Sequence, residues 1–199
     1  SEPGNLGDLI PEFSFTANFA DIDNDGYPDM LVSSDFERSQ VLRNEAGLRF
    51  IDATVKNVIN DQRGMGGAVG DYDRDGDLDA YLLTNRLESV TATAQAKIIN
   101  DKKRPLQVHP DSKELGYFVR PPGRLPILVN AGQYDYLYRN DNGRFIDVTM
   151  ESGIGKNPFY GLSSTWWDYN DDGWPDLYVA NDYMGPDHLF RNEGLDSSG

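Results

Sequence analysis

The chain has 199 residues, a formal net charge of −15 at pH 7 and no cysteine. That charge makes nucleic acid and anionic membrane surfaces poor partners, because both attract basic proteins. The lack of cysteine excludes disulfides, thiolate catalysis and zinc–thiolate sites, and no apolar run is long enough to predict a membrane-spanning helix.

The first unit, residues 13–61, begins with a predicted β-hairpin. The runs FSFTANFA and MLVSS flank the loop DIDNDGYPD at 21–29. Short β-branched and aromatic runs on both sides of a glycine-bearing loop are typical of a hairpin. The stretch VLRNEAGLRF at 41–50 predicts a third strand that ends in turn residues, and RFID predicts a fourth.

The second unit, residues 62–157, repeats this order. GGAVG and AYLLT flank the loop DYDRDGDLD at 71–79, and LYRNDNGRF leads into FIDVT at 145–149. Asp71 lies 66 residues before Leu137, whereas the matching distance in the first unit is 21 residues. The second unit therefore carries an insertion of about 45 residues.

The insertion, residues 86–133, has mixed character. LESVTATAQAKIIND predicts a short helix, the next stretch resembles loop, and YFVRPPGRLPILVN at 117–130 predicts a hairpin. A separate domain of this size without disulfides would be marginally stable. We therefore expect an excursion that projects from its blade.

The third unit, residues 158–199, is incomplete. SSTWW and LYVAN flank the loop DYNDDGWPD at 168–176, and LFRNEG follows at 189–194. The unit lacks a counterpart of FIDAT or FIDVT and ends in GLDSSG.

The repeat predicts an all-β fold made of β-propeller blades. Four antiparallel strands within ~50 residues make one blade of such a propeller. Three blades do not close a ring, because propellers have about 4–8 blades. We expect the chain to be a segment of a longer protein, or its open edges to be covered by a protein partner.

The acidic loops predict cation sites. Position 6 of each nine-residue loop is glycine, which permits a sharp turn, and five other positions offer oxygen ligands. These ligands, with the residue at position 7 giving its main-chain carbonyl, are Asp21, Asp23, Asp25, Tyr27 and Asp29; Asp71, Asp73, Asp75, Asp77 and Asp79; and Asp168, Asn170, Asp172, Trp174 and Asp176. Oxygen ligands in flexible geometry favour Ca²⁺, about one ion per loop, over Mg²⁺, zinc or copper. Asn170 weakens the third site, because it replaces a carboxylate with a neutral donor.

Two alternatives explain such loops differently. An EF-hand requires a bidentate glutamate at position 12, where this chain has Val32, Leu82 and Val179. A set of solvated acidic turns is the other alternative, since Asp and Gly are common turn formers. Three copies in register favour calcium loops within β-hairpins.

These motifs resemble a known family. The pattern DxDxDGxxD, followed by a strand and then L-Y/F-R-N-x-x-G-x-F-x-D-V-T, resembles the FG-GAP/VCBS repeat of integrin-α-like propellers. LYRNDNGRFIDVTMESGIG and DYNDDGWPDLYVAND look most like bacterial ASPIC/UnbV-type proteins and the related cartilage acidic proteins. The resemblance covers about 13–85 and 134–194. It implies structural calcium ions on the lower face and a secreted, periplasmic or surface location, although the third unit departs from the pattern.

Other side chains are weaker candidates for function. His109 and His188 are the only histidines, and both are expected to be surface or packing residues. Ser163 and Ser164 lack a nucleophile elbow, and the paired aspartates fit glycoside hydrolysis less well than cation ligation. The repeated Arg43, Arg139 and Arg191 suggest a repeated bond to a neighbouring turn or carbonyl. Blade packing and sugar stacking both remain open for the aromatic residues Trp166, Trp167 and Trp174 and Tyr134, Tyr136, Tyr138, Tyr160, Tyr169 and Tyr178.

The sequence thus predicts a calcium-stabilised, non-enzymatic propeller module for protein binding, adhesion or assembly outside the cytoplasm. No catalytic or cofactor-binding residue is predicted. A carbohydrate-binding propeller, or an accessory domain of a polysaccharide-active enzyme, is the alternative. An enzyme that uses the insertion as a lid, with His109 in its site, is a third. Residues 1–20 contain no recognisable signal peptide, and a start without Met fits a mature or trimmed product.

Overall fold

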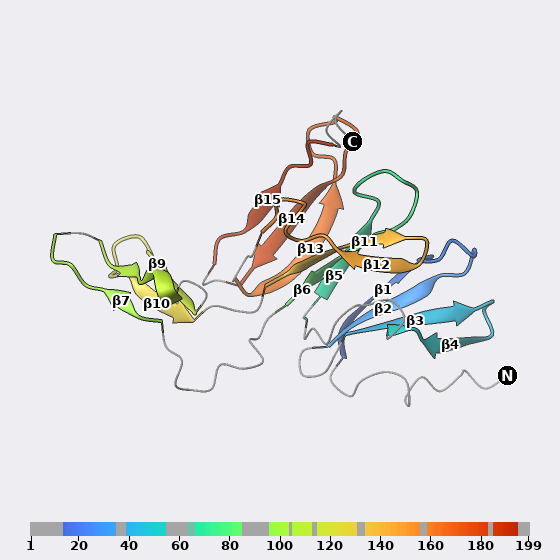
Figure 1. Cartoon of the computed structure of the whole chain (residues 1–199), viewed down its shortest axis with the longest axis horizontal. Helices are drawn as coiled ribbons and strands as arrows, with labels where there is room; N and C mark the ends of the chain where they lie inside the picture. The colour runs from blue at the N-terminus through green and yellow to red at the C-terminus, as the bar shows by residue number, and fades with distance from the viewer. Residues whose placement is uncertain are drawn as a thin grey trace.

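The computed structural model describes residues 14–34, 39–54, 64, 66–84, 96–103, 105–112, 115–130, 134–155, 159–182 and 185–194. Three antiparallel sheets, one for each repeat unit, lie next to one another as an open array (Figure 1). The fold is all-β and the ring is open, which confirms the predicted fold class. Within the described residues, no helix is long and apolar enough to cross a membrane.

The first blade has the four strands that the sequence predicts. They are β1 (Ser14–Ala20), β2 (Asp29–Ser34), β3 (Gln40–Glu45) and β4 (Arg49–Asp52), paired in chain order. Ala20 pairs with Asp29 across the first hairpin, so the acidic loop joins the ends of β1 and β2 directly.

The second blade has the same order despite the insertion. Its strands are β5 (Gly66–Gly70), β6 (Asp79–Leu83), β11 (Tyr136–Asp141) and β12 (Arg144–Asp147). β11 pairs with β6 in the same register in which β3 pairs with β2.

The third blade has three strands, namely β13 (Gly161–Trp167), β14 (Asp176–Asn181) and β15 (His188–Phe190). Within the described residues, β15 pairs only with β14, so one edge of this sheet has no neighbouring strand.

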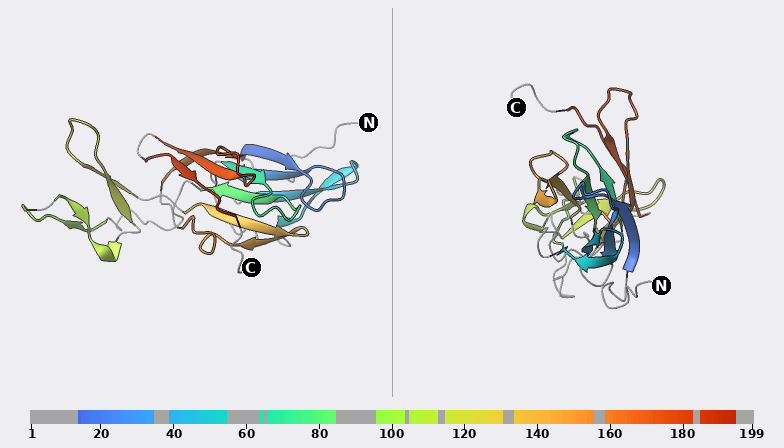
Figure 2. Two further views of the ribbon diagram at one scale, coloured as in Figure 1. Left: turned by 90° about the horizontal axis from the view of Figure 1, so that it is seen from above. Right: turned by 90° about the vertical axis from the view of Figure 1, so that its right-hand side faces the viewer.

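The insertion forms small β elements that lie to one side of the blades in Figure 1 and in the left-hand view of Figure 2. They are β7 (Ile98–Ile99), β8 (Gln107–Val108), the 3₁₀ helix η2 (Pro110–Ser112), β9 (Gly116–Val119) and β10 (Ile127–Asn130). β9 and β10 form the predicted hairpin.

The predicted short helix in the insertion is wrong at Ile98 and Ile99, which pair with β8, while residues 87–95 lie outside the described residues. β-branched residues favour such pairing over a helix.

Two apolar clusters join neighbouring blades. The first joins blade 1 to blade 2 and includes Leu31, Val41, Tyr138 and Phe145. The second joins blade 2 to blade 3 and includes Tyr81, Leu137, Leu177 and Val179. Burying such side chains stabilises the fold by about 1.5–3 kcal/mol each, so these clusters help to hold neighbouring blades together.

A carboxylate at the start of the third strand recurs in blades 2 and 3. Asp135 accepts hydrogen bonds from the Tyr81 hydroxyl at 2.9 Å and the Thr84 amide at 2.8 Å. Asp187 accepts the matching bonds in blade 3, from the Tyr178 hydroxyl at 2.7 Å and the Asn181 amide at 2.9 Å. Asp135 is buried and Asp187 is exposed.

The difference in burial gives the two carboxylates opposite pKa shifts. Burial raises the pKa of Asp135 to about 7, although the bonds from Thr84 and Tyr81 oppose the rise. The Tyr178 hydroxyl lowers the pKa of the exposed Asp187. Asp135 is therefore protonated in the folded chain at pH values where it is ionised in the unfolded chain.

This pair predicts opposite pH dependences of stability. A raised folded pKa contributes stability that is present below the unfolded pKa and lost as pH rises to about 7. The stability advantage of the wild type over Asp135→Asn should therefore fall between about pH 4 and pH 7. Urea unfolding at several pH values measures it.

Asp187→Asn is the matched control. A lowered pKa contributes stability that is lost as pH falls through it. The advantage of the wild type over this variant should therefore shrink only at acid pH. The same pH trend in both variants would contradict the assignment.

Candidate metal centre

The three acidic loops share one backbone conformation. Positions 4 and 6 have left-handed φ angles in every copy. These angles are 57° and 89° at Asn24 and Gly26, 62° and 97° at Arg74 and Gly76, and 56° and 89° at Asp171 and Gly173. Position 6 is a glycine in every loop, as expected, whereas no loop has a glycine at position 4. Asn and Asp tolerate this region, but nothing in the sequence marks Arg74 as left-handed.

The first aspartate of each loop holds the turn in place. The Asp21 carboxylate accepts the Asp25 amide at 3.0 Å and the Gly26 amide at 2.8 Å. Asp168 accepts the matching two amides, and Asp71 accepts the Gly76 amide at 3.2 Å. These hydrogen bonds fix the loop around the space where the carboxylates converge.

The carboxylates converge in the first two loops. Ligand oxygens of Asp21, Asp23 and Asp25 lie within 4.8 Å of one another, as do those of Asp71, Asp73 and Asp79. One oxygen each of Asp23 and Asp71 is buried without a hydrogen-bond partner.

A buried carboxylate oxygen without a partner is costly, and neighbouring negative charges add repulsion. A divalent cation would relieve both effects. The donors are all hard oxygens, so the set fits Ca²⁺.

The third loop is less suited to a cation. Asn170 donates its side-chain amide to Asp172 at 2.7 Å, and Arg191 lies 3.7 Å from the same carboxylate. The amide of Trp174, then Asn170 and Arg191, lower the pKa of Asp172. Within the described residues this loop has no group of three converging acidic ligands. The predicted weakness of the third site therefore has a second cause, the arginine, which the sequence did not indicate.

The aspartates at position 9 are both potential ligands and structural links. Asp29 accepts the Ile22 amide at 3.0 Å and the Asn44 amide at 2.7 Å, and it is almost fully buried. Asp79 and Asp176 make the same pair of bonds in their blades.

Burial raises the pKa of Asp79 to about 7. Cation binding at this loop would therefore be coupled to loss of a proton near neutral pH.

The main-chain amides at position 7 make the same hydrogen bond in all three loops, while the ligand role of their carbonyls stays a prediction. The amides of Tyr27, Asp77 and Trp174 each donate to the carboxylate at position 5, at 2.9, 2.8 and 3.0 Å. The Asp77 side chain has a further role, since it accepts bonds from Asn24 in blade 1 and from the Asn142 amide, both at 2.6 Å. It thus ties the first loop to the second.

The asparagine of each Leu-x-Arg-Asn strand is a structural residue that the sequence analysis missed. Asn140 donates to the Leu78 carbonyl of its own blade at 3.1 Å and to the Ile22 carbonyl of blade 1 at 2.8 Å. Asn192 makes the equivalent bonds to Pro175 and to Tyr72 of blade 2. The asparagine recurs beside the arginine in every unit, and this recurrence is the feature of the sequence that could have predicted its role.

The repeated arginines meet carboxylates, and one of these lies in a neighbouring turn, as expected. Arg43 lies 3.7 Å from Glu45, Arg139 binds Asp141 through two nitrogens, and Arg191 approaches Asp172. Each therefore meets a carboxylate, and the turn carbonyls are bound by the asparagines.

The other candidate residues divide between packing and surface. His188 stacks between Phe159 and Phe190, at 5.3 and 5.4 Å between ring centroids. His109 is half-buried and lies 3.4 Å from Asp111. Trp166 stacks on Tyr72 of blade 2 at 6.3 Å, which makes it a packing residue.

Comparison with known proteins supports the repeat that this geometry describes. Residues 21–82 match the family model of the FG-GAP-like repeat. The match spans both well-formed acidic loops and the strands between them. No curated protein gives a significant match to the chain.

The first two FG-GAP-like loops should bind Ca²⁺ and stabilise the fold. Chelation of Ca²⁺ should lower the melting temperature, because an ion that binds only the folded chain stabilises it by linkage. Asp71→Asn should reduce that response, because only the site in the first loop then remains, and calorimetric titration of the chelated protein measures the sites.

Asp101→Asn, in the insertion, is the matched control and should leave the response unchanged. A melting temperature insensitive to chelation in the wild type would refute the calcium assignment.

Asn140→Ala should destabilise the chain more than Asn44→Ala. Asn44 donates to the Pro28 carbonyl of its own blade, whereas Asn140 also binds blade 1. A lost bond to a buried carbonyl costs about 1–3 kcal/mol, so denaturant unfolding should separate the variants by about that amount. Equal costs would mean that the bond between blades contributes nothing.

Proposed function

We propose that the chain is part of a calcium-stabilised, non-enzymatic β-propeller module that binds protein in an extracytoplasmic assembly. The FG-GAP-like repeat and the open array of blades support a propeller-like module. The acidic loops supply rigidity, and the binding surface lies elsewhere.

One observation carries this proposal, the exposure of the outer face of blade 3. Leu31 and Val41 pair across the first blade, and Tyr81 and Leu137 pair at the same place in the second. All four side chains are at most 1% exposed, because the following blade covers them. Their counterparts in blade 3, Tyr178 and Leu189, pair in the same way, but their side chains are 40% and 52% exposed.

Further apolar groups extend this face. Trp167, at the end of β13, is 69% exposed, although its counterpart in blade 1, Ala20, is buried. Exposed apolar side chains gathered on one face mark a site of protein interaction. The face therefore favours a protein partner, or further blades, that cover it.

The proposed calcium sites also support a location outside the cytoplasm. Loops that carry four side-chain ligands and bind Ca²⁺ weakly fill only where the ion is plentiful, outside the cytoplasm. The charge of −15 keeps such a module soluble and away from anionic surfaces.

A carbohydrate-binding propeller is the second candidate. Trp167, at the end of β13, and Tyr169, two residues later, are both exposed. Exposed aromatic rings can stack on sugars, whereas Trp166 is committed to packing. Glycan-array binding that is lost in Trp167→Ala would favour this candidate.

Photo-crosslinking tests the protein-binding proposal. A photoreactive amino acid at position 178 should cross-link a partner protein in the extracytoplasmic fraction of the producing cells, and chelation of Ca²⁺ should reduce the yield. The same probe at Arg144, an exposed position on β12, is the control. Equal cross-linking from both positions, or none from 178, would contradict the proposed surface.

A further inference from the structure

We propose that the insertion is a cationic binding arm that docks a short acidic segment of a partner protein, in which apolar side chains alternate with carboxylates. The arm is the described part of the insertion, within residues 96–130, and lies to one side of the blades (Figure 1). Because it belongs to no blade, this surface goes beyond the proposed function.

The charge of the arm is opposite to that of the rest of the chain. Residues 96–130 contain seven of the 18 Lys and Arg residues but only three of the 33 Asp and Glu residues. Their formal charge is therefore +4, whereas the rest of the chain carries −19. Because exposed charges act over about 8 Å at physiological ionic strength, a small ligand at the arm meets mainly the positive field of the arm.

The cations of the arm differ from the repeated arginines of the blades in having no carboxylate partner. Each of those arginines approaches a carboxylate of its own blade, as Arg139 approaches Asp141 at 2.8 Å. Among the described residues, no ion pair joins a carboxylate to the exposed arm cations Lys97, Lys102, Lys103 and Arg124. Their charges are therefore available to an anionic ligand.

Apolar side chains are exposed next to these cations. Ile98 and Ile99 of β7 are 47% and 36% exposed. Leu125, in the turn between β9 and β10, is 85% exposed, and Ile127 of β10 is 41% exposed. Exposed apolar groups rimmed by polar ones mark sites of interaction. The ligand should therefore carry apolar groups as well as negative charge.

A hydrogen bond joins the two hairpins of the arm. The Arg120 guanidinium donates to the Leu106 carbonyl at 2.7 Å. Leu106 precedes the residue that pairs with Ile99. Arg120 follows the residue that pairs with Ile127. The isoleucines of the two hairpins are thus linked through one bond, so one extended segment can contact both hairpins.

The arm is supported before any ligand binds. The Ser112 hydroxyl accepts the Lys97 amide at 2.9 Å, and the Lys97 carbonyl accepts the His109 amide at 2.7 Å. Tyr117 of β9 packs edge-on against Phe159, just before β13, at 4.7 Å between ring centroids. A preformed surface loses less entropy on binding, which favours affinity for a short segment.

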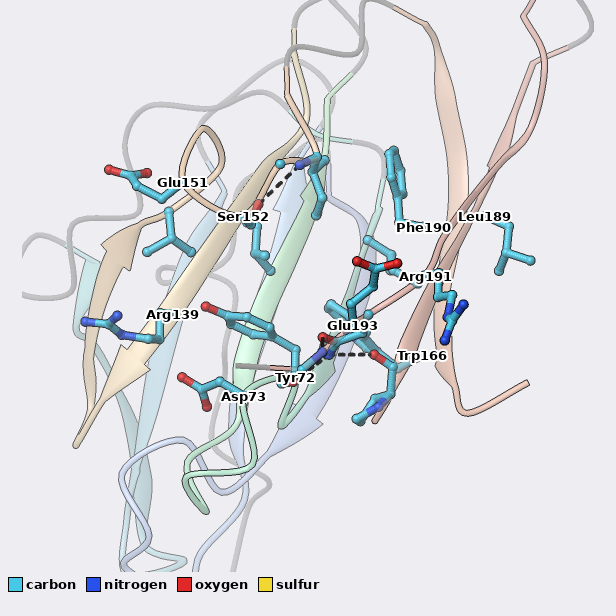
Figure 3. Close-up of a pocket in the computed structure, with 18 residues that line it drawn as sticks. Tyr72, Asp73, Arg139, Glu151, Ser152, Trp166, Leu189, Phe190, Arg191 and Glu193 are labelled. Carbon is cyan, nitrogen blue, oxygen red and sulfur yellow. Dashed lines mark hydrogen bonds between the residues drawn. The ribbon is translucent and has the colours of Figure 1, made fainter. Parts of the chain in front are cut away.

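A groove of about 580 Å³ between blades 2 and 3 is a different feature (Figure 3). Its walls include Leu137, Leu177 and Phe190 and, among the described residues, none from the arm. These three side chains belong to the cluster that joins the two blades. The groove is therefore part of the packing between blades, whereas the arm is a free surface.

A short acidic protein segment fits the arm better than other anionic ligands do. A membrane or a nucleic acid would meet the whole molecule, whose net charge of −15 repels it. An acidic polysaccharide supplies carboxylates but no apolar side chains to cover Leu125 and the isoleucines. A segment of alternating acidic and apolar residues complements both features.

A labelled peptide GEELEEIEEG tests the site by fluorescence anisotropy with the full 199-residue chain. It should bind saturably and more weakly as salt rises, because salt screens exposed charges. One matched peptide has glutamine for every glutamate, and a second has serine for leucine and isoleucine. Both should bind at least about tenfold more weakly. No saturable binding of GEELEEIEEG at millimolar concentration, or equal binding of either matched peptide, would overturn the proposal.

A double charge reversal locates the peptide on the arm. Lys102 and Lys103 are exposed, so Lys102→Glu with Lys103→Glu should leave the melting temperature unchanged and weaken binding at least about tenfold. The matched control, Arg49→Glu with Arg144→Glu, reverses two exposed cations of the blades and should change the affinity less than about twofold. An equal loss in both variants would show that net charge decides binding and would overturn the site.

A second pair of variants tests the apolar part of the surface. Leu125→Ser should weaken binding severalfold. Leu48→Ser is the matched control, because Leu48 is 86% exposed in a turn of blade 1, and it should leave binding unchanged. Bound peptide should shift the NMR signals of Ile98 and Ile127. Shifts confined to the blades would overturn the site.

Vesicles and a polysaccharide test the other anionic ligands. Vesicles of phosphatidylglycerol and phosphatidylcholine, and alginate, should bind more weakly than the peptide. Tighter binding of either, lost on reversal of Lys102 and Lys103, would overturn the choice of a protein segment. Such a failure would leave the proposed function intact, because chelation and cross-linking at position 178 test that function separately.

Discussion

A buried carboxylate with two main-chain hydrogen bonds holds each blade together. Asp29, Asp79 and Asp176 each accept one amide from their own loop and one from the asparagine of the third strand. Hydrogen bonds to a charged group contribute about 1.5–3 kcal/mol each, against a desolvation cost of several kcal/mol for the buried charge. Burial raises the pKa of Asp79 to about 7, because the charged form of this carboxylate loses its hydration in the folded blade. The same group that closes the blade therefore also favours ion binding.

The carboxylate would link cation binding, where it occurs, to the contact between blades. The asparagine whose amide it holds donates its side chain to the loop of the preceding blade, as in Asn140 to Ile22 and Asn192 to Tyr72. The loop, the third strand and the neighbouring blade thus share one hydrogen-bond network. An ion in one loop would stiffen a contact that lies outside that loop.

Equivalent positions in the three blades can also be compared directly with one another. The same pair of positions is buried in blades 1 and 2 and exposed at Tyr178 and Leu189 in blade 3. Burial raises the pKa of Asp135, whereas the equivalent hydrogen bonds lower the pKa of the exposed Asp187. Sequence repetition therefore shows which surfaces of the last blade lack the cover that the earlier blades receive.

The sequence by itself determined the β fold, the order of strands and the acidic loops, because hairpin patterns and ligand spacings are local. It also placed the glycine of each loop and predicted the weakness of the third, through Asn170. Only the tertiary structure decided that Arg191 approaches that loop, that the asparagines bind the preceding blade, and that Trp166 packs while Trp167 is exposed. The contacts between blades depend on which blade lies next to which strand, and the asparagine bonds span more than 100 residues, so no spacing in the sequence indicates them. The groove between blades 2 and 3 is of the same kind, since its walls come from two blades.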